Sequence, residues 1–159
     1  MSVLSGKTVE KLKIMEPHCK RTRHSNGMTY GAGSSSYDCR IDVGPDNITK
    51  QLVIRPGKFK LAATIEKFKM PKNVCGFVKD KSTYARMGLS VFNTFIDPGW
   101  EGYLTIEIAN HGDSTITLTQ GEPICQIVFM FTDEETEGYE GKYQNQKRGA
   151  VPAKRDKTK

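Results

Sequence analysis

Two short stretches of the sequence carry side chains that could act together on a phosphorylated substrate. The first is Lys81-Ser82-Thr83 with Arg86, and the second contains Glu107 within an alternating run. Lysine, serine and threonine at a helix start suit a polyphosphate, because the free backbone N–H groups there attract anions. A carboxylate on a strand can act as a general base, although most such carboxylates are simply solvated. Each stretch is therefore a weak indication by itself.

The local patterns predict which elements position these side chains. Residues 80–88 predict one or two helical turns that Asp80 could cap and Gly88 could end. Ser82 and Arg86 would then lie four residues apart on one helix face. Residues 103–109 predict a strand, because apolar and polar side chains alternate there. Its predicted faces are Leu104, Ile106 and Ile108 on one side, and Tyr103, Thr105, Glu107 and Ala109 on the other.

The remaining pattern is mainly of the β type. Short alternating or apolar runs after residue 37 are separated by turn signals such as Gly44-Pro45-Asp46 and Asp97-Pro98-Gly99, which is typical of an all-β sandwich or barrel. Residues 124–131 are nearly all apolar and predict a strand buried on both faces. Residues 5–15 favour a short amphipathic helix, and the polar residues 16–36 predict a loop. We predict a β-barrel nucleotide-binding domain over residues 1–132 and an arm or lid over residues 133–159 with a disordered basic end.

Composition is that of an ordinary globular protein with one domain. The chain has 159 residues, of which 26% are charged and 36% hydrophobic. Its net charge of +6 is concentrated in residues 147–159, which hold six Lys and Arg residues and one Asp. A basic tail can bind phosphate groups of any kind, but we expect this one to be mostly solvated and do not expect a nucleic-acid partner.

The cysteines and the hydropathy pattern indicate the compartment. Cys19, Cys39, Cys75 and Cys125 form no CxxC pair and no zinc-ligand spacing with histidine. Cysteines isolated in this way are typical of an intracellular protein, in which they stay reduced and act as small apolar residues. The first residues lack the apolar core of a signal peptide, and no apolar run approaches the ~18 residues of a membrane span. We expect a cytoplasmic protein without membrane contact and without a metal held by its own side chains.

Three stretches taken together resemble one known family. Residues 80–110 read DKSTYARMGLSVFNTFIDPGWEGYLTIEIAN and closely resemble the signature of the dCTP deaminases, which belong to the dUTPase-like superfamily. Residues 36–40 (SYDCR) resemble the family's early strand, and residues 141–151 resemble its C-terminal lid. The matches follow the order of the family and span most of the sequence from residue 36 onward.

The resemblance implies a fold, an assembly and a set of site residues. The fold would be all-β, a dUTPase-like distorted jelly-roll β-barrel, assembled as a homotrimer with active sites between subunits. Glu107 would be the catalytic carboxylate, and Ser82 and Arg86 would position the attacking water. Mg²⁺ would be bound through the nucleotide triphosphate. The implied substrate-binding positions are Lys81, Ser82 and Thr83 at the triphosphate, Arg86 at the water, Asp97 near the deoxyribose, the strand backbone around Thr105 at the base, and Tyr139, Lys142 and Gln146 on the lid.

The chemistry of these residue types is consistent with hydrolytic deamination of dCTP to dUTP and ammonia in pyrimidine deoxynucleotide metabolism. Most base deaminases activate water with zinc through an H-x-E…P-C-x-x-C signature, and this sequence lacks it. Glu107 would instead take a proton from water and deliver it to N3 or to the leaving amine. Arg86 would stabilise developing negative charge, and Ser82 would orient the water.

Functions of two other kinds stay open at this point. The first is a related enzyme, above all a bifunctional one that forms dUMP and pyrophosphate, because Asp97 could take part in that hydrolysis. A pure dUTP diphosphatase fits less well, since the arm sequence KYQNQKRGAVPAK lacks the Gly-rich motif that closes such sites. The other is a catalytically idle protein whose basic tail contacts nucleic acid or a partner, against which the intact Ser82, Arg86 and Glu107 set argues. Residues 92–96 also lack the histidine and the longer loop of some family members.

Overall fold

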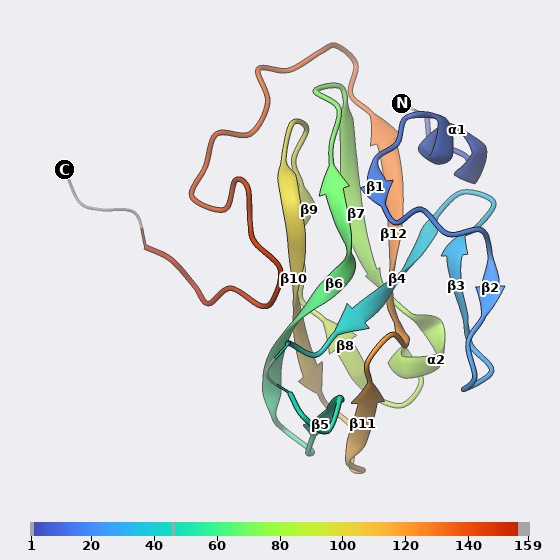
Figure 1. Cartoon of the computed structure of the whole chain (residues 1–159), viewed down its shortest axis with the longest axis vertical. Helices are drawn as coiled ribbons and strands as arrows, with labels where there is room; N and C mark the ends of the chain where they lie inside the picture. The colour runs from blue at the N-terminus through green and yellow to red at the C-terminus, as the bar shows by residue number, and fades with distance from the viewer. Residues whose placement is uncertain (1, 46, 156–159) are drawn as a thin grey trace.

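The computed structural model describes residues 2–45 and 47–155, and its regular structure is mainly β, which confirms the predicted class (Figure 1). Within those residues, no helix has the length and apolar character needed to cross a membrane. The elements in sequence order are α1 (Gly6–Lys11), β1 (Met15–Glu16), β2 (Thr22–Arg23), β3 (Thr29–Ala32), β4 (Tyr37–Asp42), β5 (Gln51–Ile54), β6 (Phe59–Lys69), β7 (Val74–Asp80), α2 (Ser82–Ala85), β8 (Leu89–Val91), β9 (Phe95–Ile96), β10 (Glu101–Asn110), β11 (Ile116–Thr119) and β12 (Pro123–Phe131).

The main sheet joins strands that are far apart in the sequence. Its order is β8-β10-β6-β4-β12-β7-β9, with β1 and β3 attached at its side and β2 paired to β3. A separate two-stranded sheet pairs β11 with β5. The register places Cys39 of β4 opposite Cys125 of β12, and Thr105 of β10 opposite Ala63 of β6. Because β10 is held between β6 and β8, the strand that carries Glu107 has a fixed place in the sheet.

The interior is apolar and also holds the ion pair of Arg40 with Glu66. Ile106 and Ile108 are fully buried in this core, as the alternating pattern predicts for their face. The apolar run 124–131 lies in β12, where Phe129 is fully buried but Val128 and Met130 are only partly buried, so the prediction of burial on both faces is only partly met. The carboxylate of Glu66 is also fully buried, and it accepts hydrogen bonds from the Arg40 backbone N–H at 3.0 Å and from Arg40 Nε at 2.9 Å. Arg40 belongs to the SYDCR segment, residues 36–40. This segment, which resembles the family's early strand, therefore helps to hold β4 against β6.

Strand β10 confirms the predicted strand over residues 103–109 and extends it at both ends. Its register with β6 shifts between Tyr103 and Thr105, which marks a β-bulge. A bulge interrupts strict alternation, and Leu104 consequently lines the same cavity as Thr105 and Glu107. The prediction that placed Leu104 on the opposite face from Glu107 is therefore wrong at this residue.

Helix α2 confirms the helical interruption in the β pattern, but its cap differs from the prediction. Lys81 is the N-cap residue, without a side-chain cap hydrogen bond. Asp80 Oδ1 instead accepts a hydrogen bond of 2.8 Å from the backbone N–H of Val91, which joins the end of β7 to β8. Gly88 follows the helix with φ +86°, and a Cβ there would lie 2.6 Å from the backbone nitrogen of Gly112. Glycine is thus required where the backbone leaves this helix.

The N-terminal region is only partly as predicted. Ser5 caps α1 by accepting a hydrogen bond from the Thr8 N–H at 3.3 Å, but the helix ends at Lys11. Met15, predicted within the helix, lies in β1 opposite Phe68. The predicted loop over residues 16–36 contains β2 and β3, which pair with each other. These short polar strands have no hydrophobic period, so the sequence pattern does not reveal them.

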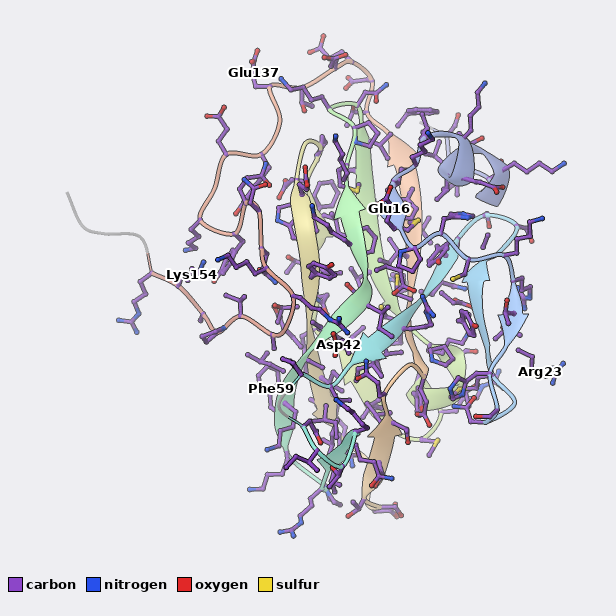
Figure 2. All side chains as sticks on the ribbon, viewed as in Figure 1. Glu16, Arg23, Asp42, Phe59, Glu137 and Lys154 are labelled. Atoms are coloured by element: carbon purple, nitrogen blue, oxygen red, sulfur yellow. The ribbon has the colours of Figure 1, made fainter. Side chains whose placement is uncertain are left out.

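The segment after β12 returns along the side of β10, where it is drawn in orange to red in Figure 1. Figure 2 shows Glu137 and Lys154 on this arm and Asp42 on β4. Arg148 Nε donates to Asp42 Oδ2 at 2.6 Å, which ties the arm to the sheet. Arg148 makes this contact while 59% of its side chain stays exposed, which agrees with the prediction of a mostly solvated basic tail. The terminal residues predicted to be disordered include residues 156–159, which lie outside the described part of the protein.

Candidate active site

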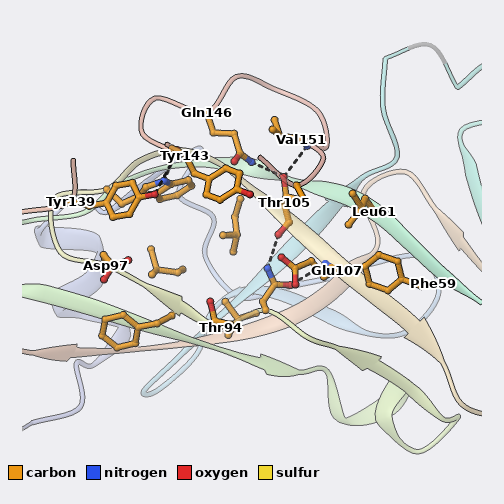
Figure 3. A pocket seen from close by; sticks show the side chains of 17 residues that line it. Phe59, Leu61, Thr94, Asp97, Thr105, Glu107, Tyr139, Tyr143, Gln146 and Val151 are labelled. Carbon is orange, nitrogen blue, oxygen red and sulfur yellow. Dashed lines mark hydrogen bonds between the residues drawn. The ribbon is translucent and has the colours of Figure 1, made fainter. Parts of the chain in front are cut away.

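A cavity of about 450 Å³ lies between β10, residues 93–97 and the C-terminal arm (Figure 3). Five predicted site residues line it, namely Asp97, Thr105, Glu107, Tyr139 and Gln146. They come from three separate segments of the sequence, which the sheet and the arm bring to one place. The cavity is therefore lined by the predicted catalytic carboxylate, the predicted contact to the sugar, the strand predicted to bind the base, and two residues predicted on the lid.

Glu107 is half-buried on the cavity wall, and its backbone is held at both ends. Its N–H donates to Asn93 Oδ1 at 3.1 Å, and its C=O accepts from the Phe92 N–H at 2.8 Å. Burial raises the pKa of the Glu107 carboxyl above its ordinary value of 4.5. A carboxyl with a raised pKa can both accept and return a proton nearer to neutral pH, as general acid–base catalysis requires.

Thr105 links the strand to the arm. Its Oγ1 accepts hydrogen bonds from Gln146 Nε2 at 2.6 Å and from the Val151 N–H at 3.0 Å, and dashed lines mark them in Figure 3. Gln146 Nε2 also donates to the C=O of Tyr103 at 2.7 Å. A Cβ on Gly102 would lie 2.7 Å from the Gln146 backbone nitrogen, so the arm approaches a strand position that only glycine allows. The arm is thus closed over the cavity within this one chain.

Aromatic residues form the wall next to Asp97. Trp100 is buried, packs near Phe68 and donates from Nε1 to the C=O of Tyr143 at 2.8 Å. The Tyr139 N–H donates to the C=O of Pro98 at 2.8 Å, which holds the arm on the turn after Asp97. Trp100 packs in the hydrophobic core and also lines the cavity.

The other predicted site residues do not line this cavity within one subunit. Lys81 Nζ is engaged by Asp38 Oδ2 at 2.5 Å and by the C=O of Thr29 at 2.8 Å. Ser82, Thr83 and Arg86 are exposed on and beside α2. Lys142 lies on the arm with its Nζ 5.7 Å from the centre of the Tyr143 ring. Within one chain the predicted site residues therefore fall into two separate groups, one that lines the cavity and one that does not. That the two groups come together stays a prediction, and it requires a second subunit.

Asn93, Tyr143 and Val151 line the cavity without having been predicted as site residues. Asn93 hydrogen-bonds to the backbone at Thr105 and Glu107, and Val151 hydrogen-bonds to Thr105. For Asn93 the sequence contains one signal, which is a lone amide between a strand end and the Asp97 turn. For Val151 there is none, because an apolar residue in a polar tail has no periodic context.

Comparison with protein families agrees with this geometry. The model of the family described as dCTP deaminase-like matches residues 25–132, which is more than half of the protein. The chain belongs to this family. It is 34% identical to the dCTP deaminase of Campylobacter jejuni, over 84% of this chain and 86% of that protein. It is 33% identical to the dCTP deaminase of Helicobacter hepaticus, over 92% of this chain and 93% of that protein.

Solved structures show the same fold at low sequence identity. A dCTP deaminase from Agrobacterium tumefaciens superposes with a TM-score of 0.62 at 15% identity, covering 80% of this chain and 48% of that protein. A dUTPase from a phage of S. aureus gives a TM-score of 0.53 at 16% identity, covering 79% of this chain and 93% of that protein. The chain therefore has the predicted dUTPase-like, jelly-roll type of β fold.

Proposed function

We propose that this protein hydrolyses dCTP to dUTP and ammonia as part of pyrimidine deoxynucleotide metabolism. The observation that carries the proposal is the Glu107 carboxyl, which lines the cavity with its pKa raised by burial. Membership of the dCTP deaminase-like family and the names of the relatives support the same substrate. A cytoplasmic location, expected from the sequence, belongs to this proposal.

In this reaction Glu107 is the group that moves protons. Its carboxylate takes a proton from a water molecule as the water oxygen bonds to C4 of the cytosine ring, and it passes that proton to N3. It then carries the proton of the new C4 hydroxyl to the amino group, the C4–N4 bond breaks, and ammonia leaves with the electron pair of that bond, so that a carbonyl remains at C4 and a proton at N3. Enclosure by the arm limits access of bulk water, which strengthens the electrostatic effect of each group in the cavity.

Ser82 and Arg86 complete the site only if they come from another subunit. Both are exposed and neither lines the cavity of its own subunit. A homotrimer with sites between subunits would place the α2 segment of one subunit against the cavity of the next. Arg86 would then stabilise negative charge on the attacking oxygen, Ser82 would orient the water, and Lys81, Ser82 and Thr83 would face the triphosphate.

Magnesium would enter with the nucleotide. Among the described residues, no group of three His, Cys, Asp or Glu side chains is placed to hold a metal ion. Mg²⁺ commonly binds through substrate phosphates and one or two carboxylates, and the cavity presents the Asp97 carboxylate. These residues fit a metal that is bound mainly by the triphosphate, where it would neutralise phosphate charge.

The position of Asp97 also favours a second candidate. Its carboxylate lines the same cavity as Glu107, so a water activated near the phosphates could release pyrophosphate and leave dUMP. The two activities would then act in sequence on one nucleotide.

Product analysis tests both candidates. The purified protein is incubated with dCTP and Mg²⁺, and dUTP, dUMP, pyrophosphate and ammonia are separated and measured. We expect dUTP and ammonia in equal amounts. Formation of dUMP with pyrophosphate would establish the bifunctional reaction instead. Hydrolysis of dUTP without any reaction of dCTP would contradict the deaminase.

A further inference from the structure

One edge of β10 is covered by a side chain where a neighbouring strand ends. Strand β8 pairs with residues 108–110 of β10 and ends at Val91. Beyond that point the Phe92 N–H still donates to the C=O of Glu107. The next backbone groups along the edge, the Glu107 N–H and the Thr105 C=O, have no strand opposite them on this side. The carboxamide of Asn93 binds both.

The Asn93 carboxamide closes a two-point hydrogen-bonded ring with the strand. Its Nδ2 donates to the Thr105 C=O at 2.6 Å, and its Oδ1 accepts from the Glu107 N–H at 3.1 Å. The group is planar and presents an amino donor beside an acceptor. A cytosine ring presents the same pair on one edge, where its exocyclic amino group adjoins a ring nitrogen acceptor. The strand edge is thus filled by a group with the hydrogen-bonding pattern of the base.

The covered segment is short and bounded. At the end of this segment away from β8, Gln146 Nε2 donates hydrogen bonds to the C=O of Tyr103 and to Thr105 Oγ1. The arm therefore already covers the strand there. Asn93 therefore covers the stretch between the arm and the end of β8, and it lines the same cavity as Glu107. A ring bound at this stretch would accept a hydrogen bond at N3 from the backbone of the residue whose carboxyl is the proposed base, and it would give up that hydrogen bond when N3 is protonated in the reaction.

We propose that Asn93 occupies the position of the pyrimidine ring in the unliganded protein and gives up the edge of β10 when the base binds. The inference rests on the proposed function and adds a base-selecting residue to it. Exchange of two neutral hydrogen bonds for two equivalent ones is nearly balanced, so a ligand can displace the side chain. Asn93 then competes with the substrate and excludes rings that lack the matching donor and acceptor.

Calorimetric binding of dCTP tests this competition in the Glu107→Gln background, where turnover does not interfere. Adding Asn93→Ala removes the competing carboxamide and should tighten dCTP binding by about tenfold, the value of one to two neutral hydrogen bonds. Asn47→Ala is the matched control, because Asn47 Nδ2 also binds a backbone carbonyl, that of Gln51, outside the cavity. It should leave dCTP binding unchanged. In the otherwise native enzyme, Asn93→Ala should lower KM more than it changes kcat.

A second measurement keeps the native side chain. The Asn93 side-chain amide signals in the NMR spectrum of Glu107→Gln, assigned by their loss in Asn93→Ser, should shift when dCTP is added. Unchanged signals, or dCTP binding that is weaker or equal in a folded Asn93→Ala variant, would overturn the inference. The proposed function would fail in a different way, because the native protein would then not deaminate dCTP and Glu107→Gln would not bind it.

Discussion

At the scale of single residues, Glu107 decides whether the protein is a deaminase. Glu107→Gln keeps the size of the side chain and removes its ability to accept a proton. We predict that kcat for dCTP falls by about 10²–10⁴-fold while dCTP binding is retained, because general acid–base catalysis contributes about that much. Glu101→Gln is the control on the same strand, since Glu101 forms only a partly exposed ion pair with Lys67. Near-native turnover of Glu107→Gln would reject the mechanism.

The pH dependence follows from the same carboxyl. Burial raises the pKa of Glu107 above 4.5 and disfavours its charged form in the folded protein. The base is active only when ionised, so the acid limb of the kcat/KM profile should lie above pH 4.5. A raised folded-state pKa contributes stability at low pH that is lost as pH rises through that pKa. Glu107→Gln should therefore unfold at the same or a higher temperature than the native protein at neutral pH. An acid limb at or below the ordinary pKa would contradict the assignment.

At the scale of elements, the arm depends on Thr105. Thr105→Val keeps the shape of the side chain and removes the oxygen that accepts from Gln146 and Val151. The arm should open more often, which raises KM for dCTP by about tenfold, because each lost hydrogen bond is worth about 1 kcal/mol. Hydrogen exchange of residues 146–153 should quicken in parallel. Thr117→Val, an exposed threonine on β11, should leave both quantities unchanged.

Arg148 is a second attachment of the arm. Burial alone would raise the pKa of Asp42, but the Arg148 guanidinium and the Gly44 N–H hold that pKa below its ordinary value of 3.8. A lowered pKa gives stability that is present above the unfolded-state pKa and lost as pH falls through the folded-state value, so the contact persists at neutral pH. We predict that Arg148→Ala costs about 1 kcal/mol, since the exposed guanidinium is partly screened by solvent.

Chemical denaturation and hydrogen exchange measure this second attachment. Arg148→Ala should lower the unfolding midpoint and expose the amides that follow residue 146. Lys147→Ala is the neighbouring control, because Lys147 is exposed and no hydrogen bond of its side chain is seen in the described structure. Equal effects of the two substitutions would show that the Asp42 contact does not hold the arm.

Sequence patterns predict elements that have their own period and miss those that depend on partners. Alternation reveals β10, a serine marks the start of α1, and Gly88 marks the end of the segment that contains α2. The bulge that turns Leu104 toward the cavity has no such signal, because it arises from the pairing with β6. The Lys81–Asp38 ion pair joins residues that are far apart in the sequence, so spacing cannot reveal it. The same holds for Asn93, whose partners lie on another strand.

At the scale of the whole molecule, the divided site predicts how subunits cooperate. The cavity with Glu107 and the exposed segment with Arg86 belong to different surfaces of one subunit. If each active site combines the Glu107 cavity of one subunit with the Arg86 segment of a neighbouring subunit, then Glu107→Gln and Arg86→Ala each inactivate a different half of the site. Mixing the two inactive variants, with unfolding and reassembly, should therefore restore activity. In random trimers about a quarter of the sites would receive both native residues, because each half has an even chance of coming from the suitable variant.

The mixing experiment separates shared sites from sites within one subunit. A site built from a single subunit would gain nothing, since every subunit in the mixture lacks one essential residue. Recovery should reach about a quarter of native activity in equal mixtures and should require exchange of subunits. Doubly substituted protein mixed with either single variant serves as the control. Mixed with Glu107→Gln it must stay inactive, because no subunit then supplies the carboxylate. Activity in the first mixture and none in the control would place Arg86 of one subunit at the Glu107 cavity of another.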